Sequence, residues 1–505
     1  MTASFTEQST AIEPPALPGA LGPIAARSSA AIAAAKIIRY GFVFLVQVIL
    51  MNLLAPADFG VVRYVAVIIG LLGLLNEAGL STAIVQRKQL ERNQLGSVFT
   101  LSLAFSMLVY AAVWLVSSPL ARFFGEPRLG PMITAAGLAL PLGAVTVIHR
   151  ALLQRHMRFI RLSTVEAVSA VAGAVVSVVL AFMKFGAWSL VWGTVVFHAV
   201  SSLCYVIIEP SVQPSTVGIR TAFSLFAFGM GVVVQRLIDF ASSNVDYIVI
   251  GKLFGAEQLG LYGIAYDIVT LPQMALGVVF ASVAMSAFSR VQDDAVRLEQ
   301  AYLNLTLVVS VLAAPFIVIA GCMAIDVLGA VTILKPSAKW LGAAPYLQIL
   351  APVGLLYSFT SYPGTVWVAK GRIDVQIGWA IAMFVTVLAA VLAGASFGIE
   401  GVCWALLIRA ILLFPAAMII SRRIASISPR RYLLALAPAI VCATAAAAAA
   451  MLCIILIPVR STLGHALRLV IGAAIAGIAY VSLLYIVFRK QWDTFIRLAR
   501  NLGER

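Results

Sequence analysis

Charged side chains interrupt the long apolar segments of this 505-residue chain at helical spacing. Arg63 and Glu77 are fourteen residues apart, close to four helical turns, so they share one face of a helix. An ionisable group is costly inside a bilayer, and one that is retained there is expected to face a water-filled cavity or a partner. We therefore expect a hydrated lumen lined by Lys36, Arg39, Arg63, Glu77, Arg236, Asp239, Asp246 and Arg409.

Arginine and lysine in such a lumen would bind an anionic group, because charge-assisted hydrogen bonds replace the hydration that the anion loses. Tyr262 and Tyr266, on one helix face, add flat aromatic surfaces to the same predicted lumen. A structural role is the alternative for each residue: Lys36 can extend to the headgroups, Arg236 and Asp239 can form a fixed ion pair, and tyrosines can pack between helices. The lumen is thus predicted to be cationic, with aromatic walls.

Ion coupling and motion would need further residues. A carboxylate whose protonation or Na⁺ occupancy differs between two states could couple a conformational change to an ion gradient. The candidates are Asp246, Glu77 and Asp267. Prolines inside helices remove a backbone donor and permit kinks, so we expect bending, or else static curvature, at Pro272, Pro352 and Pro363. Apart from a coupling H⁺ or Na⁺, we expect no cofactor and no metal site.

The elements that must position these residues are membrane-spanning helices. A composition that is 62% hydrophobic, with a mean hydropathy of +1.03, excludes a soluble globule. Each span must satisfy its own backbone polar groups, and the ten-residue alternating segments of a β-barrel are absent. We predict an all-α polytopic membrane protein with about fourteen spans, at 28–54, 58–84, 96–118, 129–150, 162–183, 186–208, 223–251, 257–288, 300–325, 343–369, 374–394, 399–421, 432–457 and 463–488.

The basic residues predict the orientation. Of the 35 lysines and arginines, 22 fall in the tails and the even-numbered connections, and seven fall on the other side. This excess places both termini in the cytosol by the positive-inside rule. Membrane topology also explains the net charge of +15, so nucleic-acid binding is not expected.

An internal repeat with a spacing of 200 residues links 53–61 to 253–261, each at the junction between one long helix and the next. Both copies follow an odd-numbered span, so they lie on the same side of the membrane and indicate a parallel duplication of six helices. The predicted organisation is a disordered cytosolic tail (1–27), an N-lobe (28–210), a C-lobe (211–425), two added spans (426–490) and a basic cytosolic tail (491–505).

Four segments resemble the polysaccharide transporter family, the Wzx-type flippases of the multidrug/oligosaccharidyl-lipid/polysaccharide exporter superfamily, and are closest to its colanic-acid-exporter branch. They are EAGLSTAIVQRK at 77–88, FFGEPRL at 123–129, LLQRHMRF at 152–159 and NVDYIVIGKLFGAEQLGLY at 244–262. The resemblance implies two six-helix lobes and the transfer of an undecaprenyl-diphosphate-linked oligosaccharide from the inner to the outer leaflet of the bacterial inner membrane. Membrane lipids, and a polysaccharide polymerase and copolymerase, are the partners that this role would bring.

Two other functions remain open. A polymerase, ligase or lipid-linked glycosyltransferase would need a sizeable external domain, whereas the longest predicted external connection, 326–343, is short. A multidrug exporter of the same superfamily would favour an acidic cavity, whereas the first-lobe spans contain more Arg and Lys than Asp and Glu. We therefore expect a transporter and not an enzyme.

Overall fold

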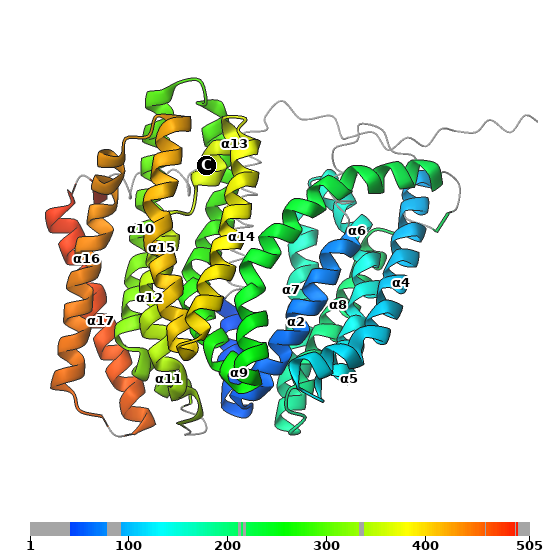
Figure 1. Ribbon diagram of the computed structural model, residues 1–505, viewed down its shortest axis with the longest axis horizontal. Coiled ribbons are helices and arrows are strands. Elements are labelled where there is room, and N and C mark those ends of the chain that lie inside the picture. The colour runs from blue at the N-terminus through cyan, green and yellow to red at the C-terminus, as the bar shows by residue number, and fades with distance from the viewer. Residues whose placement is uncertain are drawn as a thin grey trace, which may run out of the picture. The chain divides into compact units, whose positions relative to one another are not determined.

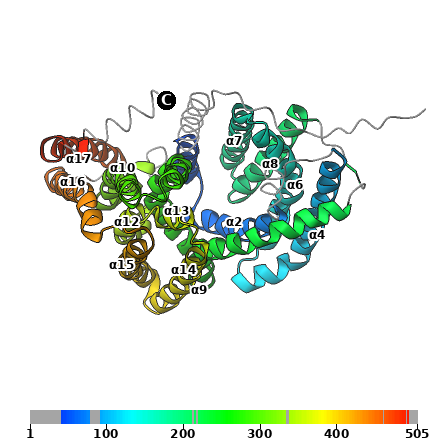
Figure 2. The same cartoon turned by 90° about the horizontal axis from the view of Figure 1, so that it is seen from above.

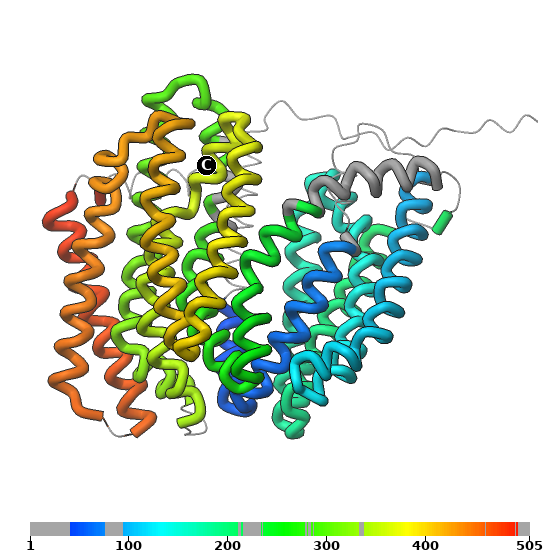
Figure 3. Tube along the Cα trace, viewed as in Figure 1, coloured from blue at the N-terminus to red at the C-terminus, as the bar shows by residue number. Residues whose placement is uncertain are grey.

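The computed structural model describes residues 41–77, 92–210, 214–215, 219–332, 338–459, 461–489 and 491–492 (Figure 3). Within these residues the secondary structure consists of α-helices and one short 3₁₀ helix, without strands. Twelve of the described helical segments are long and apolar enough to cross a membrane. The predicted fold class is confirmed: this is an all-α polytopic membrane protein. The predicted tails lie outside the described residues, apart from 491–492.

The described residues form two compact units. Unit 1 contains Tyr64–Phe240, and unit 2 contains the described part of Lys36–Arg63 together with Ala241–Arg505. This division by packing differs from the lobes expected from the sequence at 36–63 and 211–240. The lobe boundaries stay predictions.

Unit 1 is a helical bundle in which α7 packs on α8, α6 packs on α8, and α4 contacts both α5 and α6 (Figure 1). Its helices are α2 (Pro56–Glu77, from Tyr64 onward), α4 (Arg92–Phe124), α5 (Leu129–Gly137), α6 (Ala139–Arg155), α7 (Phe159–Phe182), α8 (Trp188–Ile208) and the beginning of α9 (Ile219–Arg290).

Small residues hold α7 against α8. Ser169, Gly173 and Ser177 recur every fourth position on α7 and are buried. A Cβ atom on Gly173 would overlap the backbone carbonyl of Gly193 on α8, so the two backbones approach closely. In lipid, where the hydrophobic effect does not drive helices together, such close packing of small residues is a main source of helix association.

Unit 2 contains the helix Gly41–Leu53, the beginning of α2, the rest of α9 and eight further α-helices. The bounds are α10 (Ala295–Cys322), α11 (Ala324–Val331), η1 (Ala338–Ala343), α12 (Ala344–Phe359), α13 (Pro363–Ala369), α14 (Ile373–Ala395), α15 (Gly398–Ala425), α16 (Pro429–Leu456) and α17 (Thr462–Val487). Its core lies where α10, α16 and α17 pack together, and α12 packs against both α10 and α15 (Figure 2). Large apolar side chains on α16 and α17 remain exposed, as expected for surfaces that face lipid.

Three predicted spans are interrupted. The segment 129–150 forms α5 and α6, 300–325 forms α10 and the beginning of α11, and 343–369 forms η1, α12 and α13. Pro363 was expected inside a helix and instead begins α13, after a break at 360–362. The physical reason is that proline lacks an N–H group, which only the first turn of a helix can spare.

The long helix α9 changes direction at one residue. Gly255 has φ 82° and ψ 178°, a backbone conformation that is essentially restricted to glycine. This break falls between the predicted spans 223–251 and 257–288, so their junction is confirmed. The count of fourteen spans stays a prediction, because residues 1–40 lie outside the described part and Gly41–Leu53 is only a short apolar helix there.

The two copies of the repeat, copy A (53–61) and copy B (253–261), contact each other within unit 2. A Cβ atom on Gly60 would overlap the carbonyl of Ala256, and a Cβ atom on Gly260 would overlap the carbonyl of Pro56. Positions 56 and 60 correspond to 256 and 260 in the repeat, so the contact is reciprocal. The beginnings of α2 and of the second half of α9 therefore cross with their backbones touching.

The connection between α11 and α12 caps the helix that precedes copy A. Lys339 Nζ donates to the carbonyl of Leu54 at 2.6 Å, and Trp340 Nε1 donates to the carbonyl of Met51 at 2.8 Å. The Trp340 indole is fully buried and meets the Phe59 ring edge-on at 5.2 Å. These donors satisfy carbonyls that have no partner inside a helix that ends there.

Candidate functional site

A charged and aromatic cluster lies in unit 2, where the beginning of α2 meets α9 on both sides of its break at Gly255. Arg63 on α2 forms an ion pair with Asp267 on α9, and the two side chains are 26% and 34% exposed. The Arg63 guanidinium also stands over the Tyr247 ring, 4.8 Å from its centroid. This cation is therefore neutralised, stacked on an aromatic face and still accessible.

Three tyrosines of α9 pack next to Arg63, beginning with Tyr247, which lies under its guanidinium. The rings of Tyr247, Tyr262 and Tyr266 lie 5.9–6.0 Å apart in all three pairings. Behind them, Asp246 accepts hydrogen bonds from the Tyr262 hydroxyl at 2.7 Å and from the Tyr247 backbone N–H at 2.9 Å. Asp246 is 3% exposed, so its carboxylate belongs to the wall behind the rings.

Arg409, in the middle of α15, ends the cluster on the other side. Its guanidinium donates from Nε to Thr386 Oγ1 at 3.0 Å and from Nη1 to the Tyr357 hydroxyl at 3.2 Å. It also donates from Nη2 to the Met383 carbonyl at 3.1 Å. The part of α12 that contains Tyr357 contacts α9, where Gln273 Nε2 donates to the carbonyl of Tyr357 at 3.4 Å. We call Arg63, Tyr247, Tyr266, Tyr357 and Arg409 the aromatic row, a series of rings with one arginine at each end.

The structure brings together six of the residues singled out in the sequence: Arg63, Asp246, Tyr262, Tyr266, Asp267 and Arg409. Arg236, half-buried, and Asp239, exposed, lie on the part of α9 that belongs to unit 1. Lys36, Arg39 and the side chain of Glu77 lie outside the described part of the chain. The lumen formed by all these residues stays a prediction.

Burial separates the members of the cluster. Tyr262 is completely buried and its hydroxyl is held by Asp246, so it offers no ring surface to a ligand here. Tyr266 is half-buried, and Asp267 is the more exposed carboxylate. The difference follows from helical geometry, because Asp267 projects from a different side of α9 than Tyr262.

Tyr247, Tyr357, Thr386 and Met383 complete the cluster and were not singled out in the sequence. Tyr247 follows Asp246 within the segment 244–262, so its place in that segment was a usable signal. Tyr357 and Thr386 reach Arg409 from α12 and α14, and no spacing along one helix predicts such contacts.

The three hinge candidates have different surroundings. Pro272 lies inside α9 and is buried, Pro352 lies inside α12 and is exposed, and Pro363 begins α13. Bending at these positions stays a prediction.

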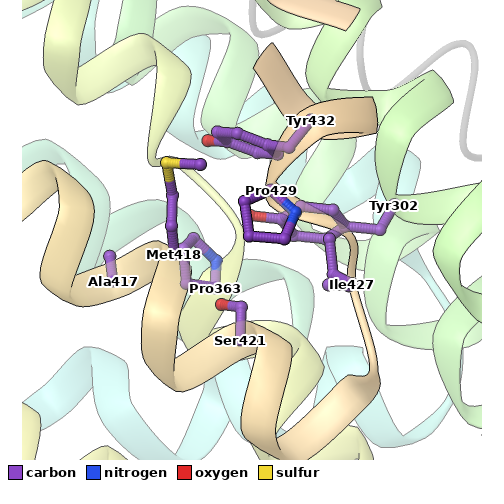
Figure 4. Close-up of a pocket in the computed structure, with 8 residues that line it drawn as sticks. All are labelled: Tyr302, Pro363, Ala417, Met418, Ser421, Ile427, Pro429 and Tyr432. Atoms are coloured by element: carbon purple, nitrogen blue, oxygen red, sulfur yellow. The ribbon is translucent and has the colours of Figure 1, made fainter. Parts of the chain in front are cut away.

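A separate small apolar pocket lies between α10, α13, α15 and α16 (Figure 4). The stacked rings of Tyr302 and Tyr432 form one side of it, and Pro363 and Met418 contribute to the lining. The Tyr432 hydroxyl donates to the carbonyl of Phe359 at 2.5 Å, so it is already engaged. No predicted substrate residue is among the eight described residues that line this pocket.

Comparison with curated proteins gives relatives of similar length. The chain is 26% identical over 411 residues to the lipopolysaccharide biosynthesis protein WzxC of Escherichia coli strain K12, covering 80% of this chain and 82% of WzxC. It is 24% identical over 473 residues to the succinoglycan biosynthesis transport protein ExoT of Rhizobium meliloti, covering 91% and 92%.

Two solved structures have the same fold. The lipid II flippase MurJ in an inward closed conformation aligns with a TM-score of 0.68 over 90% of this chain and 98% of MurJ, at 13% identity. An inward-facing multidrug MATE transporter aligns with a TM-score of 0.59 over 77% and 98%, at 16% identity. The family model described as "Polysaccharide biosynthesis protein" matches residues 49–345, more than half of the sequence. The chain therefore belongs to the polysaccharide biosynthesis protein family.

Proposed function

We propose that this protein moves an undecaprenyl-diphosphate-linked oligosaccharide repeat unit from the cytosolic to the periplasmic leaflet, for exopolysaccharide biosynthesis, by alternating access. It catalyses no covalent chemistry. Membership of the family, the relatives WzxC and ExoT, and the fold shared with a lipid II flippase support this role. The protein lies in the bacterial inner membrane with both termini in the cytosol, and a polymerase and a copolymerase act beside it.

The aromatic row is the observation that carries the proposal. An anionic sugar chain needs cations for its charges and flat surfaces for its rings. The row consists of three tyrosines with one arginine at each end, and its residues come from α2, α9, α12 and α15 of unit 2. Aromatic faces bind the apolar faces of sugar rings while leaving the hydroxyl groups to polar neighbours.

If transport is coupled to an ion, Asp246 is the favoured carboxylate of the two candidates whose side chains are described, Asp246 and Asp267. Asp267 is neutralised by Arg63, whereas Asp246 is buried and forms no ion pair among the described residues. A buried carboxylate without a cation is a natural place for H⁺ or Na⁺ to bind.

The test is leaflet transfer in proteoliposomes that contain an undecaprenyl-diphosphate-linked oligosaccharide, read from the sugar that becomes accessible to an external glycosidase. Arg63→Gln should lower the initial rate about tenfold or more, because charge-assisted hydrogen bonds are worth about 1.5–3 kcal/mol. Arg128→Gln is the control, since it removes an arginine from an exposed ion pair with Glu126 in unit 1. Wild-type protein that transfers no faster than protein-free liposomes would refute the proposal.

An ion-coupled multidrug exporter is the second candidate, favoured by the MATE-like fold. It predicts accumulation of cationic dyes in inverted vesicles under an ion gradient. Dye transport without transfer of the lipid-linked sugar would select this function instead.

A further inference from the structure

Arg409 differs from the other interior arginines described in unit 2. Arg468 donates to Asp326 from Nε at 3.0 Å and from Nη2 at 2.6 Å, and Arg63 pairs with Asp267. Arg409 is as deeply buried as Arg468, at 8% exposed, yet no carboxylate lies within ion-pair distance of it in the described residues. Its charge is solvated by neutral groups alone.

A buried cation of this kind needs a counter-charge at some stage of the protein's work, because neutral acceptors compensate a guanidinium only in part. Asp246 belongs to the same cluster and has no ion-pair partner among the described residues. Its two oxygens accept hydrogen bonds from the Tyr262 hydroxyl and the Tyr247 N–H, and neither accepts one from Arg409.

The group around Arg409 retains hydrogen-bond donors for an anion. Nη1 carries two hydrogens and bonds to one acceptor, the Tyr357 hydroxyl. The Tyr357 hydroxyl accepts that bond, and its own hydrogen has no acceptor among the described residues. The Thr386 hydroxyl, in contrast, donates to the carbonyl of Ala382 at 2.7 Å. Tyr357 is half-buried, so part of this residue is still accessible.

The charge balance indicates what the anion is. One uncompensated positive charge matches one negative charge, and a planar guanidinium fork fits a carboxylate. A diphosphate carries more charge than Arg409 alone can balance. We propose that Arg409 and Tyr357 form a subsite for a carboxylate on the sugar portion of the transported unit, such as a uronate. This inference rests on the proposed function, and it makes Arg409 a residue that determines substrate specificity.

The experiment compares two lipid-linked oligosaccharides that share the same undecaprenyl diphosphate and differ by glucuronate or glucose at one position. The readout is the ratio of initial transfer rates, acidic over neutral, in proteoliposomes. Arg409→Gln should lower this ratio about ten- to a hundredfold, the value of a charge-assisted hydrogen bond. Tyr357→Phe should lower it less, and Arg409→Lys should retain part of the preference.

The controls separate recognition from folding. Thr444→Val removes an exposed hydroxyl on α16, outside the cluster, that donates to the carbonyl of Val441 at 2.8 Å, and it should leave the ratio unchanged. If Arg409→Gln does not fold, the Tyr357→Phe and Arg409→Lys ratios still decide the question. Equal loss of both substrates would overturn the subsite, and so would an unchanged ratio. Recovery of Arg409→Gln by Asp246→Asn would also overturn it, because Asp246 would then be the counter-charge. Wild-type protein that moves neither lipid would overturn the proposed function along with it.

Discussion

Copies A and B of the repeat reach the same crossing by different local chemistry. In copy A the chain leaves one helix at 53–54, and Pro56 begins α2. In copy B there is no proline, and α9 turns at Gly255 with a positive φ. Copy A is also held from outside by Lys339 and Trp340, whereas copy B accepts a hydrogen bond from the Tyr346 hydroxyl to Gln258 Oε1 at 3.0 Å.

What both copies keep is the glycine at the crossing. A turn can be built from proline at a helix N-terminus or from glycine in an unusual conformation, so the residue at the bend is free to differ. Two backbones in contact leave no room for any Cβ atom, so Gly60 and Gly260 have no substitute. The contact between the helices is therefore the stricter requirement on the sequence, and the bend is the looser one.

Breaking the crossing should have the largest effect. Gly60→Ala or Gly260→Ala places a methyl group on a backbone carbonyl, which cannot rotate away, and should cost about 1–3 kcal/mol or more. The midpoint of thermal unfolding in detergent measures the loss. Gly73→Ala on α2 and Gly277→Ala on α9 are matched controls, because a Cβ at either position meets open space. Equal midpoints for test and control variants would refute the crossing.

The two bends should respond unequally. Gly255→Ala strains the backbone and should cost about 1–3 kcal/mol, although a Cβ there meets nothing within 4 Å. Pro56→Ala should cost less, about 0.4–1 kcal/mol, because it only frees the unfolded chain. Unfolding midpoints of the two variants give the order, and a larger loss for Pro56→Ala would contradict it.

Smaller losses are expected at the side chains that hold the two copies from outside. Trp340→Phe leaves the buried Met51 carbonyl without its indole donor and should lower the free energy of unfolding by about 1–2 kcal/mol. Tyr346→Phe removes the bond to Gln258 in a half-buried position and should cost about 0.5–1 kcal/mol. Hydrogen exchange at the amides of 50–60 and 253–261 would show whether each loss stays within its own copy. If either substitution increased exchange in both copies, the two copies would not be held independently.

The smallest effect is expected at Asp58. Its carboxylate accepts from the Ala55 N–H at 3.1 Å in an exposed position, and copy B has Gln258 at the corresponding place. Asp58→Ala should therefore cost about 0.5 kcal/mol. A shift of the unfolding midpoint as large as that of Gly60→Ala would show that copy A depends on its bend after all.

The sequence predicted the helices well because hydropathy runs mark them, and it located the junction at Gly255 through the repeat. It missed the breaks near Leu138 and Met323, since a break of one or two apolar residues leaves the hydropathy of a segment unchanged. The ion pair of Arg63 with Asp267, 204 positions apart, also escaped prediction. Helical spacing orders residues on one helix, but it does not tell which face meets which neighbour.

The reciprocal contact of Gly60 with Ala256 and of Gly260 with Pro56 has the geometry of a homodimer interface, in which residue i meets j and j meets i. A single polypeptide here reproduces what two identical subunits would form around a twofold axis. In such a dimer any substitution would appear on both sides at once. In one chain, each side is free to change alone, which allows one half to carry proline at its bend and the other to carry glycine.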